Sequence, residues 1–242
     1  MTSANGKAPT PLTIWITRAQ PGADATAARV AGLGLEAVVE PLLEVRRTTD
    51  APIDLTDVSA IAFTSANAVA AFAERSPERA VRVFAVGDAT AAAARGQRFS
   101  NVLSAQGDVT TLAAALGARR RELPGVILYP AAADPSQDLA GALGAAGLRV
   151  RQITLYETLV RQPSAALIER LSRIDGVLVH SAKAAKVLAG FLNSHPSPDL
   201  AAYCLSPQIG RSLRHAGLVA VLTAESPNEA ALLALLGPAG NA

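Results

Sequence analysis

The 242 residues of the chain suit one large domain or two of roughly 100 to 120 residues each. Half of the residues are hydrophobic, which is ample for a buried core, and the net charge of +2 without a long basic run argues against a nucleic-acid partner. The single cysteine, Cys204, excludes a disulfide framework and a thiolate metal site.

The N-terminus and the hydropathy of the chain carry no signal for export or membrane insertion. Residues 1–11 lack the apolar segment of a signal peptide, and we expect them to form a disordered tail. No apolar run is long enough to span a membrane, so no membrane partner is expected. These features favour a cytoplasmic protein.

Short apolar runs alternate with Ala-rich helical segments along the whole chain. The runs that we expect to form strands are 12–16, 35–39, 60–64, 81–86, 101–103, 125–129, 148–153, 176–180, 201–206 and 218–222. The helical segments between them include 23–33, 66–75, 109–118, 135–146, 182–192 and 228–236. Because the strands lack a polar/apolar alternation, the pattern indicates an α/β fold with parallel sheets covered by helices on both faces. Trp15 and Cys204 then fall inside buried strands, as core residues.

Two extended segments, 41–48 and 154–161, break this alternation and suit a pair of linker strands. We expect the chain to begin one lobe, cross to a second lobe, complete it, and return. Lobe one then comprises residues 1–40 and 162–242, and lobe two comprises residues 46–155. A cleft between two α/β lobes, lined by the carboxyl ends of strands, is where a ligand is expected to bind.

An internal repeat supports two similar lobes. FTSANAVAAF (63–72) resembles VHSAKAAKVL (179–188) at an offset of 116 residues. NVLSAQ resembles AVLTAE at an offset of 119, and GLEAVVEPLLE resembles GLRVRQITLYE at an offset of 113. Three matches in the same order favour lobes of one design.

The turns that follow the strands are rich in small residues and hydroxyls. In Thr64-Ser65-Ala66-Asn67, Ser65 is placed to cap a helix, either as a cap alone or as part of an anion site, because the first turn of a helix presents unpaired N–H groups. Arg18 follows the first strand, where it suits either a carboxylate clamp or a surface charge. His180 closes a strand beside Ser181, and Tyr156 lies on a linker, where it either packs as a hinge or reaches a ligand.

Familiar catalytic motifs are missing. The sequence has no Walker A motif, no G-x-G-x-x-G after a strand, no G-x-S-x-G elbow and no cluster with metal-ligand spacing. From the residues alone, the chain looks like a polyanion-binding protein in which any catalysis depends on positioning and polarisation.

Taken together, an ordered set of motifs resembles the uroporphyrinogen-III synthase family from about Leu12 to Leu236. The motifs are ITRAQPGA, EPLLE, FTSANAV, AVGDATAAAA, YET and SPNEAALLALL. The resemblance implies two flavodoxin-like lobes joined by a two-stranded linker, with the active site in the cleft. It also implies conversion of hydroxymethylbilane to uroporphyrinogen III, with loss of water and inversion of ring D, without metal or cofactor. It raises our expectation of anion contact at Ser65.

The resemblance also implies roles for individual residues. It makes Tyr156 and Thr90 the candidate catalytic residues, with Tyr156 as the donor to the leaving hydroxyl. The expected substrate-binding residues are Arg18, Thr64, Ser65, Ala66, Asn67, Gly87, His180, Ser181, Ala182, Lys183 and Gln208. We expect a monomer that contacts hydroxymethylbilane synthase transiently.

Two turns depart from the family pattern. Ser206-Pro207-Gln208-Ile209 replaces a turn that carries hydroxyls in many members, and His180 and Lys183 are local novelties. Gln208 or Lys183 is then expected to take over carboxylate binding.

Three other functions are alternatives to the synthase. They are a two-lobed small-molecule binder, a non-catalytic regulatory member of the same fold, and an α/β enzyme acting on phosphorylated sugars.

Overall fold

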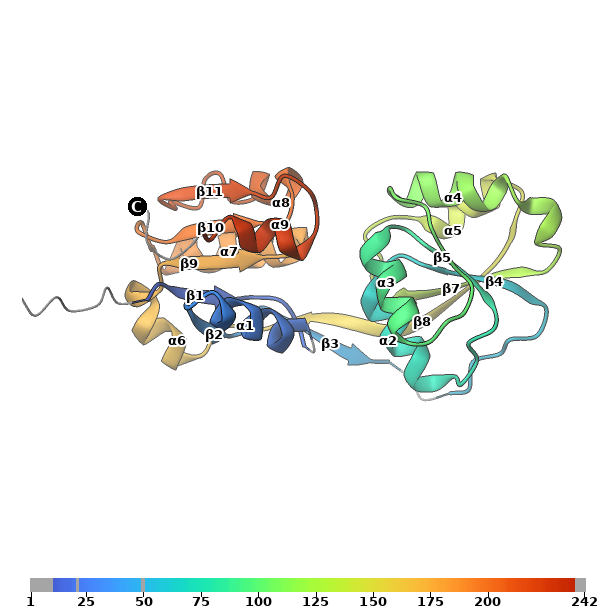
Figure 1. Ribbon diagram of the computed structural model, residues 1–242, viewed down its shortest axis with the longest axis horizontal. Helices are drawn as coiled ribbons and strands as arrows, with labels where there is room; N and C mark the ends of the chain where they lie inside the picture. Colours follow the sequence, from blue (N-terminus) through green and yellow to red (C-terminus); the bar gives the residue numbers. More distant parts are fainter. Residues whose placement is uncertain (1–10, 21, 49–50, 238–242) are drawn as a thin grey trace, which may run out of the picture. The chain divides into compact units, whose positions relative to one another are not determined.

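The computed structural model describes residues 11–20, 22–48 and 51–237. The prediction of a disordered tail at residues 1–11 therefore falls outside the described residues, apart from Pro11. The chain divides into two compact units (Figure 1). Unit 1 comprises the residues up to Glu44 and those from Val160 onward, and unit 2 comprises Val45–Leu159. Both divisions fall inside the segments 41–48 and 154–161.

Unit 1 is built on a parallel five-stranded sheet in the order β11-β10-β9-β1-β2. Its strands are β1 (Thr13–Ile16), β2 (Glu36–Val39), β9 (Gly176–Val179), β10 (Ala201–Cys204) and β11 (Ala220–Thr223). Its helices are α1 (Gly22–Gly32), α6 (Ala165–Arg170), α7 (Ala182–Ser194), α8 (Pro207–Arg211) and α9 (Glu229–Ala234), with a 3-10 turn at Leu171–Arg173.

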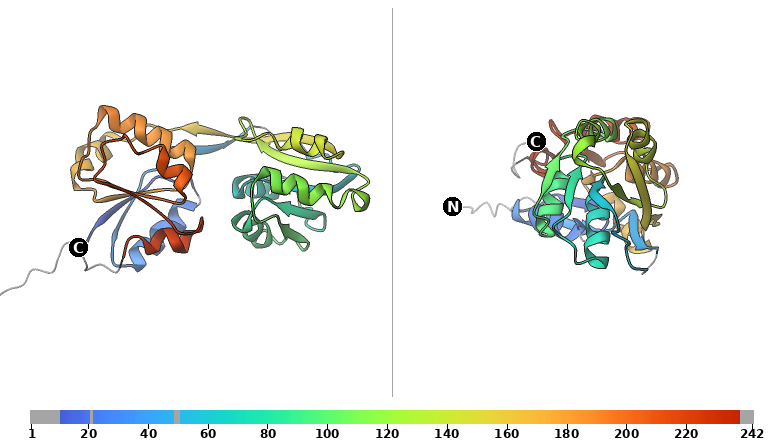
Figure 2. Two further views of the ribbon diagram at one scale, coloured as in Figure 1. Left: turned by 90° about the horizontal axis from the view of Figure 1, so that it is seen from above. Right: turned by 90° about the vertical axis from the view of Figure 1, so that its right-hand side faces the viewer.

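Alternate side chains of β1 face opposite layers of helices. Trp15 is fully buried in a cluster with residues of α7 and α8, whereas Ile14 and Ile16 are buried with residues of α1 and α9. Figure 2 shows α7 on one face of this sheet and α1 and α9 on the other. The two predictions of core residues are confirmed, since Trp15 and Cys204 are both 0% exposed.

Unit 2 contains most of a six-stranded sheet in the order β3-β8-β7-β4-β5-β6. The strands are β3 (Leu43–Arg47), β4 (Val58–Phe63), β5 (Arg82–Ala85), β6 (Val102–Ser104), β7 (Val126–Ala132) and β8 (Arg149–Val160). The helices are α2 (Ala66–Arg75), α3 (Asp88–Gly96), α4 (Val109–Gly117) and α5 (Leu139–Ala145), with a 3-10 turn at Arg120–Glu122. Neighbouring strands in the series β8, β7, β4, β5 and β6 all run parallel to one another.

Strand β3 pairs with β8 in the antiparallel direction. Thr48 donates its backbone N–H to Leu155 at 3.1 Å, and Arg161 donates to Leu42 at 2.9 Å, so the paired residue numbers run in opposite directions. Both predicted linker segments are thus extended. The described residues contain no helix that is long and apolar enough to cross a bilayer.

The sequence repeat falls on strands that hold equivalent places in the two sheets. The order β2-β1-β9-β10-β11 in unit 1 corresponds to β8-β7-β4-β5-β6 in unit 2. This correspondence pairs β9 with β4, β11 with β6 and β2 with β8, which are the strands joined by the offsets of 116, 119 and 113 residues. The two units therefore share one strand order.

Two predicted strand ends were wrong. The strand expected at 125–129 continues to Ala132, past Pro130, because β7 pairs with β8 as far as Ala132. Its pairing with β4 ends at Leu128, so Pro130 lies where β7 is an edge strand, a position that tolerates proline. The break expected between a strand at 148–153 and a linker at 154–161 does not exist. Strand β8 is continuous there, since Arg149–Val160 contains no Gly, Pro, Asn or Asp.

Candidate functional site

The Ser65 turn joins the carboxyl end of β4 to α2 in unit 2. Ser65 is the N-cap of α2, with extended backbone angles, and its Oγ accepts a hydrogen bond from the backbone N–H of Ala68 at 3.1 Å. Thr64 and Asn67 are half-buried and Ala66 is exposed. The cap predicted from the sequence is confirmed, whereas anion binding at this turn stays a prediction.

A β-bulge brings Tyr156 to this turn. Ala131 of β7 pairs with Thr154, but the next residue, Ala132, pairs with Tyr156, so Leu155 is an extra residue in β8. An extra residue reverses the facing of the side chains that follow it. Leu155 and Tyr156 consequently both pack in the cluster on the α2 side of the sheet, although neighbouring residues of a regular strand face opposite ways.

The phenol of Tyr156 is hydrogen-bonded to the hydroxyl of Ser65 at 2.8 Å, and either oxygen can be the donor. Burial raises the pKa of Tyr156, the hydrogen bond with Ser65 opposes that rise, and nearby Tyr129 adds to it. The phenol therefore keeps its proton at neutral pH. When Ser65 is the donor in this pair, the phenolic proton is available to a ligand.

Gly87 and Thr90 lie on the neighbouring strand-to-helix turn. Gly87 is the N-cap of α3 and provides no side chain for capping. Thr90 belongs to the first turn of α3 and is only 6% exposed. The backbone N–H of Val86 donates to Phe63 O at 2.9 Å, which keeps the ends of β4 and β5 side by side. The structure thus brings Tyr156 and Ser65 together, with Thr90 on the adjacent turn rather than in the hydroxyl pair.

Helix N-termini with a nearby acidic residue are poor candidates for anion binding, and those without one are better candidates. The first turn or the cap carries a carboxylate in α1 (Asp24), α3 (Asp88), α4 (Asp108), α5 (Asp138) and α9 (Glu229). Proline occupies the beginning of α8 and removes one N–H group. Helices α2, α6 and α7 have a serine cap and no acidic residue in the first turn, but Ser164 at the cap of α6 already donates to the Glu40 carboxylate, which leaves α2 and α7. A negative ligand is not repelled at these two ends.

Ser181 caps α7 in unit 1 as Ser65 caps α2 in unit 2. Its Oγ accepts from the N–H of Ala184 at 3.1 Å, and Ala182 and Lys183 form the first turn of the helix. Lys183 is exposed. Gln208, also exposed, lies at the beginning of α8 after the neighbouring strand β10. The predicted unit 1 residues are therefore spread over adjacent turns at the carboxyl edge of the sheet.

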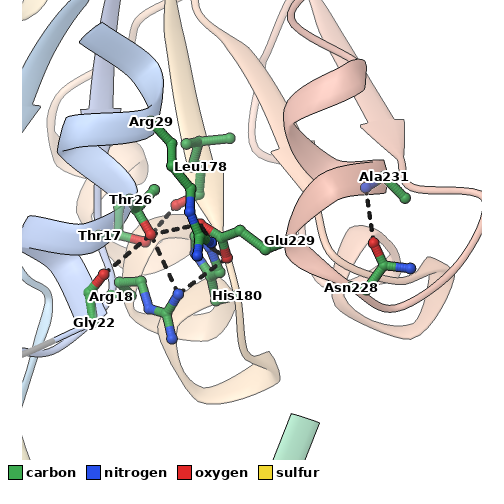
Figure 3. Close-up of polar contacts among 10 residues, drawn as sticks. All are labelled: Thr17, Arg18, Gly22, Thr26, Arg29, Leu178, His180, Asn228, Glu229 and Ala231. Atoms are coloured by element: carbon green, nitrogen blue, oxygen red, sulfur yellow. Dashed lines mark hydrogen bonds and ion pairs between the residues drawn. The ribbon is translucent and has the colours of Figure 1, made fainter. Parts of the chain in front are cut away.

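Arg18 and His180 meet at a carboxylate that the sequence reasoning missed (Figure 3). Arg18 Nη1 donates to Glu229 Oε2 at 3.0 Å, and His180 Nε2 lies 3.1 Å from the same oxygen. Thr26 Oγ1 donates to Glu229 Oε1 at 2.6 Å. Arg29 Nη1 is 3.9 Å from Oε1 and is largely exposed. We call Arg18, Thr26, His180 and Glu229 the Glu229 cluster, which brings together α1, α9 and the residues that follow β1 and β9.

The cluster keeps Glu229 ionised. Burial alone raises the pKa of this carboxyl, but the hydrogen bonds from His180 and Thr26 and the charges of His180 and Arg18 outweigh burial and lower the pKa to about 2. His180 is only 10% exposed, and its Nδ1 is buried without a hydrogen-bond partner among the described residues.

A signal for Glu229 was present in the sequence. Asn228 caps α9 and accepts from Ala231 at 2.9 Å, and Glu229 follows it in the SPNEAALLALL motif. An acidic residue at that position suits the helix dipole without any partner, which hid its role. No local pattern connects it to Arg18, which lies 211 residues earlier in the chain. No group of three or more His, Cys, Asp or Glu side chains in the described part of the chain is placed to hold a metal ion.

Comparisons with known proteins agree with the arrangement of sheets and helices. The crystal structure of uroporphyrinogen-III synthetase from Helicobacter pylori 26695 superposes with a TM-score of 0.62 at 18% identity, covering 93% of this chain and 98% of that one. A mutant uroporphyrinogen III synthase from the extremely thermophilic bacterium Thermus thermophilus superposes with a TM-score of 0.57 at 17% identity, covering 93% and 96%. No curated protein matches the chain by sequence. The family model of uroporphyrinogen-III synthase HemD matches residues 24–234, and the chain belongs to this family.

Proposed function

We propose that this chain is a hydro-lyase that cyclises hydroxymethylbilane to uroporphyrinogen III. The observation that carries the proposal on this chain is the Tyr156–Ser65 hydroxyl pair, which places a protonated phenol beside a helix N-terminus free of acidic residues. Family membership supports it across residues 24–234. The reaction needs a proton donor for a leaving hydroxyl and sites for carboxylates, and both are available at this turn.

The first step breaks the bond between carbon and hydroxyl. Tyr156 donates its proton to the hydroxyl of the bilane, which leaves as water and creates an azafulvene cation. The substituted carbon of ring D attacks this cation to form a spiro intermediate, which fragments and recloses with ring D reversed. The proton released on closure restores the phenol, so water is the only by-product.

Orientation of the bilane is the larger task of the protein. The linear tetrapyrrole also cyclises without enzyme, but to the type I isomer, so the protein must hold the chain where the substituted carbon reacts. We assign carboxylate contacts to Thr64, Ser65, Ala66, Asn67 and Gly87 in unit 2, and a supporting contact with the substrate to Thr90. In unit 1 we assign them to Arg18, His180, Ser181, Ala182, Lys183 and Gln208.

We infer from the family resemblance that each unit is a flavodoxin-like lobe. The shared strand order supports this inference. We also infer that segments 41–48 and 154–161 link the lobes and that the bilane binds in a cleft between them. A monomeric state, a cytoplasmic location and transient contact with hydroxymethylbilane synthase remain predictions.

An isomer assay tests the function directly. Hydroxymethylbilane is generated in situ, the protein is added, and the oxidised porphyrins are separated by chromatography. We expect type III porphyrin to predominate. Type I alone, formed at the uncatalysed rate, would overturn the proposal and leave a non-catalytic binder of small anions or a regulatory member of the fold.

A further inference from the structure

Arg18 is held on one side only. Its Nη1 donates to Thr26 Oγ1 at 3.2 Å and to Glu229 Oε2 at 3.0 Å. Within the described residues, neither Nε nor Nη2 has a hydrogen-bond partner, and the side chain is 34% exposed. Figure 3 shows the remainder of the guanidinium directed away from the Glu229 carboxylate. Nε and Nη2 can therefore donate hydrogen bonds to a second carboxylate while Nη1 keeps its bond to Glu229.

Gly22 makes room for this orientation of Arg18. A Cβ added to Gly22 would lie 2.6 Å from Nε, 2.7 Å from Cζ and 2.7 Å from Nη2 of Arg18. Three nearly equal distances mean that the added carbon would sit over the plane of the guanidinium, not beside its edge. The guanidinium thus lies flat on the backbone at the beginning of α1, and only glycine permits that approach.

Glu229 contacts each of the other residues of the cluster. Its Oε1 accepts from Thr26, and its Oε2 accepts from Arg18 and faces His180. It is 18% exposed, and it belongs to α9, which lies 211 residues from Arg18 along the chain. A carboxylate whose pKa is about 2 keeps its charge at every pH suited to the assay, so it does not serve as a proton donor there.

We propose that Glu229 is a positioning residue that orients Arg18 so that Nε and Nη2 bind a carboxylate of the substrate. The inference rests on the proposed function and deepens it, because it names the residue that makes the Arg18 contact specific. The ligand chemistry is that of an acetate or propionate side chain, for which an arginine fork has matching geometry. Glu229 itself does not touch the substrate.

A purely structural role for Glu229 makes a different prediction. If the cluster only stabilises unit 1, removing the charge lowers the free energy of unfolding and leaves the KM for the bilane unchanged. If Glu229 orients Arg18, removing the charge raises KM, and it does so only while Arg18 is present. The dependence on Arg18 distinguishes the two roles.

The experiment compares Glu229→Gln, Arg18→Ala and the double variant in the full chain. The Gln side chain keeps the shape of Glu229 but removes the negative charge with which Arg18 pairs. We expect the KM for hydroxymethylbilane to rise about tenfold in each single variant, with kcat within twofold of the wild type. The double variant should match Arg18→Ala, because Glu229 acts through Arg18.

Arg29→Gln is the matched control. Arg29 approaches the same carboxylate at 3.9 Å but is 58% exposed, so its loss should leave KM unchanged. Unchanged KM in Glu229→Gln, or a further rise in KM on adding Glu229→Gln to Arg18→Ala, would overturn the inference while type III porphyrin still forms. A wild-type protein that yields only type I porphyrin would overturn the proposed function, and this inference with it.

Discussion

The Ser65 turn and the Ser181 turn occupy equivalent places in the two units but have different chemistry. Both serines cap a helix after a central strand and accept from the N–H three residues later at 3.1 Å. Beside Ser65 lies the neutral phenol of Tyr156, and next to Ser181 lies His180 of the ionised Glu229 cluster. The same strand-turn-helix unit therefore occurs in two chemical environments. Tyr156 provides the neutral environment at Ser65, and Glu229 provides the charged one beside Ser181.

This difference indicates that the two turns have different roles, proton transfer at Ser65 and orientation of Arg18 beside Ser181. A neutral hydroxyl pair can pass a proton to a leaving group, because the phenol is protonated at neutral pH. A permanently ionised cluster cannot do so, but it fixes the direction of Arg18 without changing its own protonation state. We accordingly expect the chemical step to depend on unit 2 and the binding of one substrate carboxylate to depend on unit 1.

The largest expected effect is the loss of the phenolic hydroxyl. Tyr156→Phe should lower kcat about 100-fold, because the variant removes a general acid while keeping the ring that packs in the core. Single-turnover formation of type III porphyrin measures the effect. Tyr203→Phe is the matched control, since Tyr203 is a half-buried tyrosine on β10 of unit 1, and its kcat should not change. Equal rates for Tyr156→Phe and wild type would remove Tyr156 from the catalytic role.

Acid should weaken unit 1 through Glu229. The folded pKa of about 2 lies below the ordinary value of 4.5, so the ionised carboxylate stabilises the folded state fully above pH 4.5 and loses this contribution as pH falls toward 2. Between pH 6 and pH 3 we expect the wild type to lose about 2 kcal/mol more than Glu229→Gln. The groups that face Glu229 are Arg18, Arg29 and His180.

The sequence offers a probe that reports on unit 1 alone. Trp15 is the only tryptophan and is fully buried in unit 1, so its fluorescence during urea unfolding follows that unit. Circular dichroism follows both units together. An identical pH dependence for wild type and Glu229→Gln by fluorescence would show that the cluster contributes no pH-dependent stability.

Local patterns predicted much of the fold because strands, caps and turns are encoded by neighbouring residues. Ser65 was recognised as a cap, and the central strands of both sheets were placed to within a few residues. The bulge at Leu155 was missed because it exists only relative to β7, and a register cannot be read from one strand. The pairing of Arg18 with Glu229 was missed because no local pattern relates residues so far apart along the chain.

The smallest expected effect is a difference between two serine substitutions. Ser65→Ala and Ser181→Ala each remove a helix cap, which costs about 1 kcal/mol. Ser65→Ala also leaves the buried Tyr156 hydroxyl without its partner, which adds about 1 kcal/mol. Denaturant unfolding should therefore show that Ser65→Ala is less stable than Ser181→Ala by about 1 kcal/mol. The Trp15 fluorescence should respond only to Ser181→Ala, because Trp15 lies in unit 1. Adding Tyr156→Phe to Ser65→Ala removes the unsatisfied hydroxyl and should restore most of the difference. If the two serines prove equal, the hydroxyl pair contributes nothing to stability, and the contrast between the turns is confined to their charge.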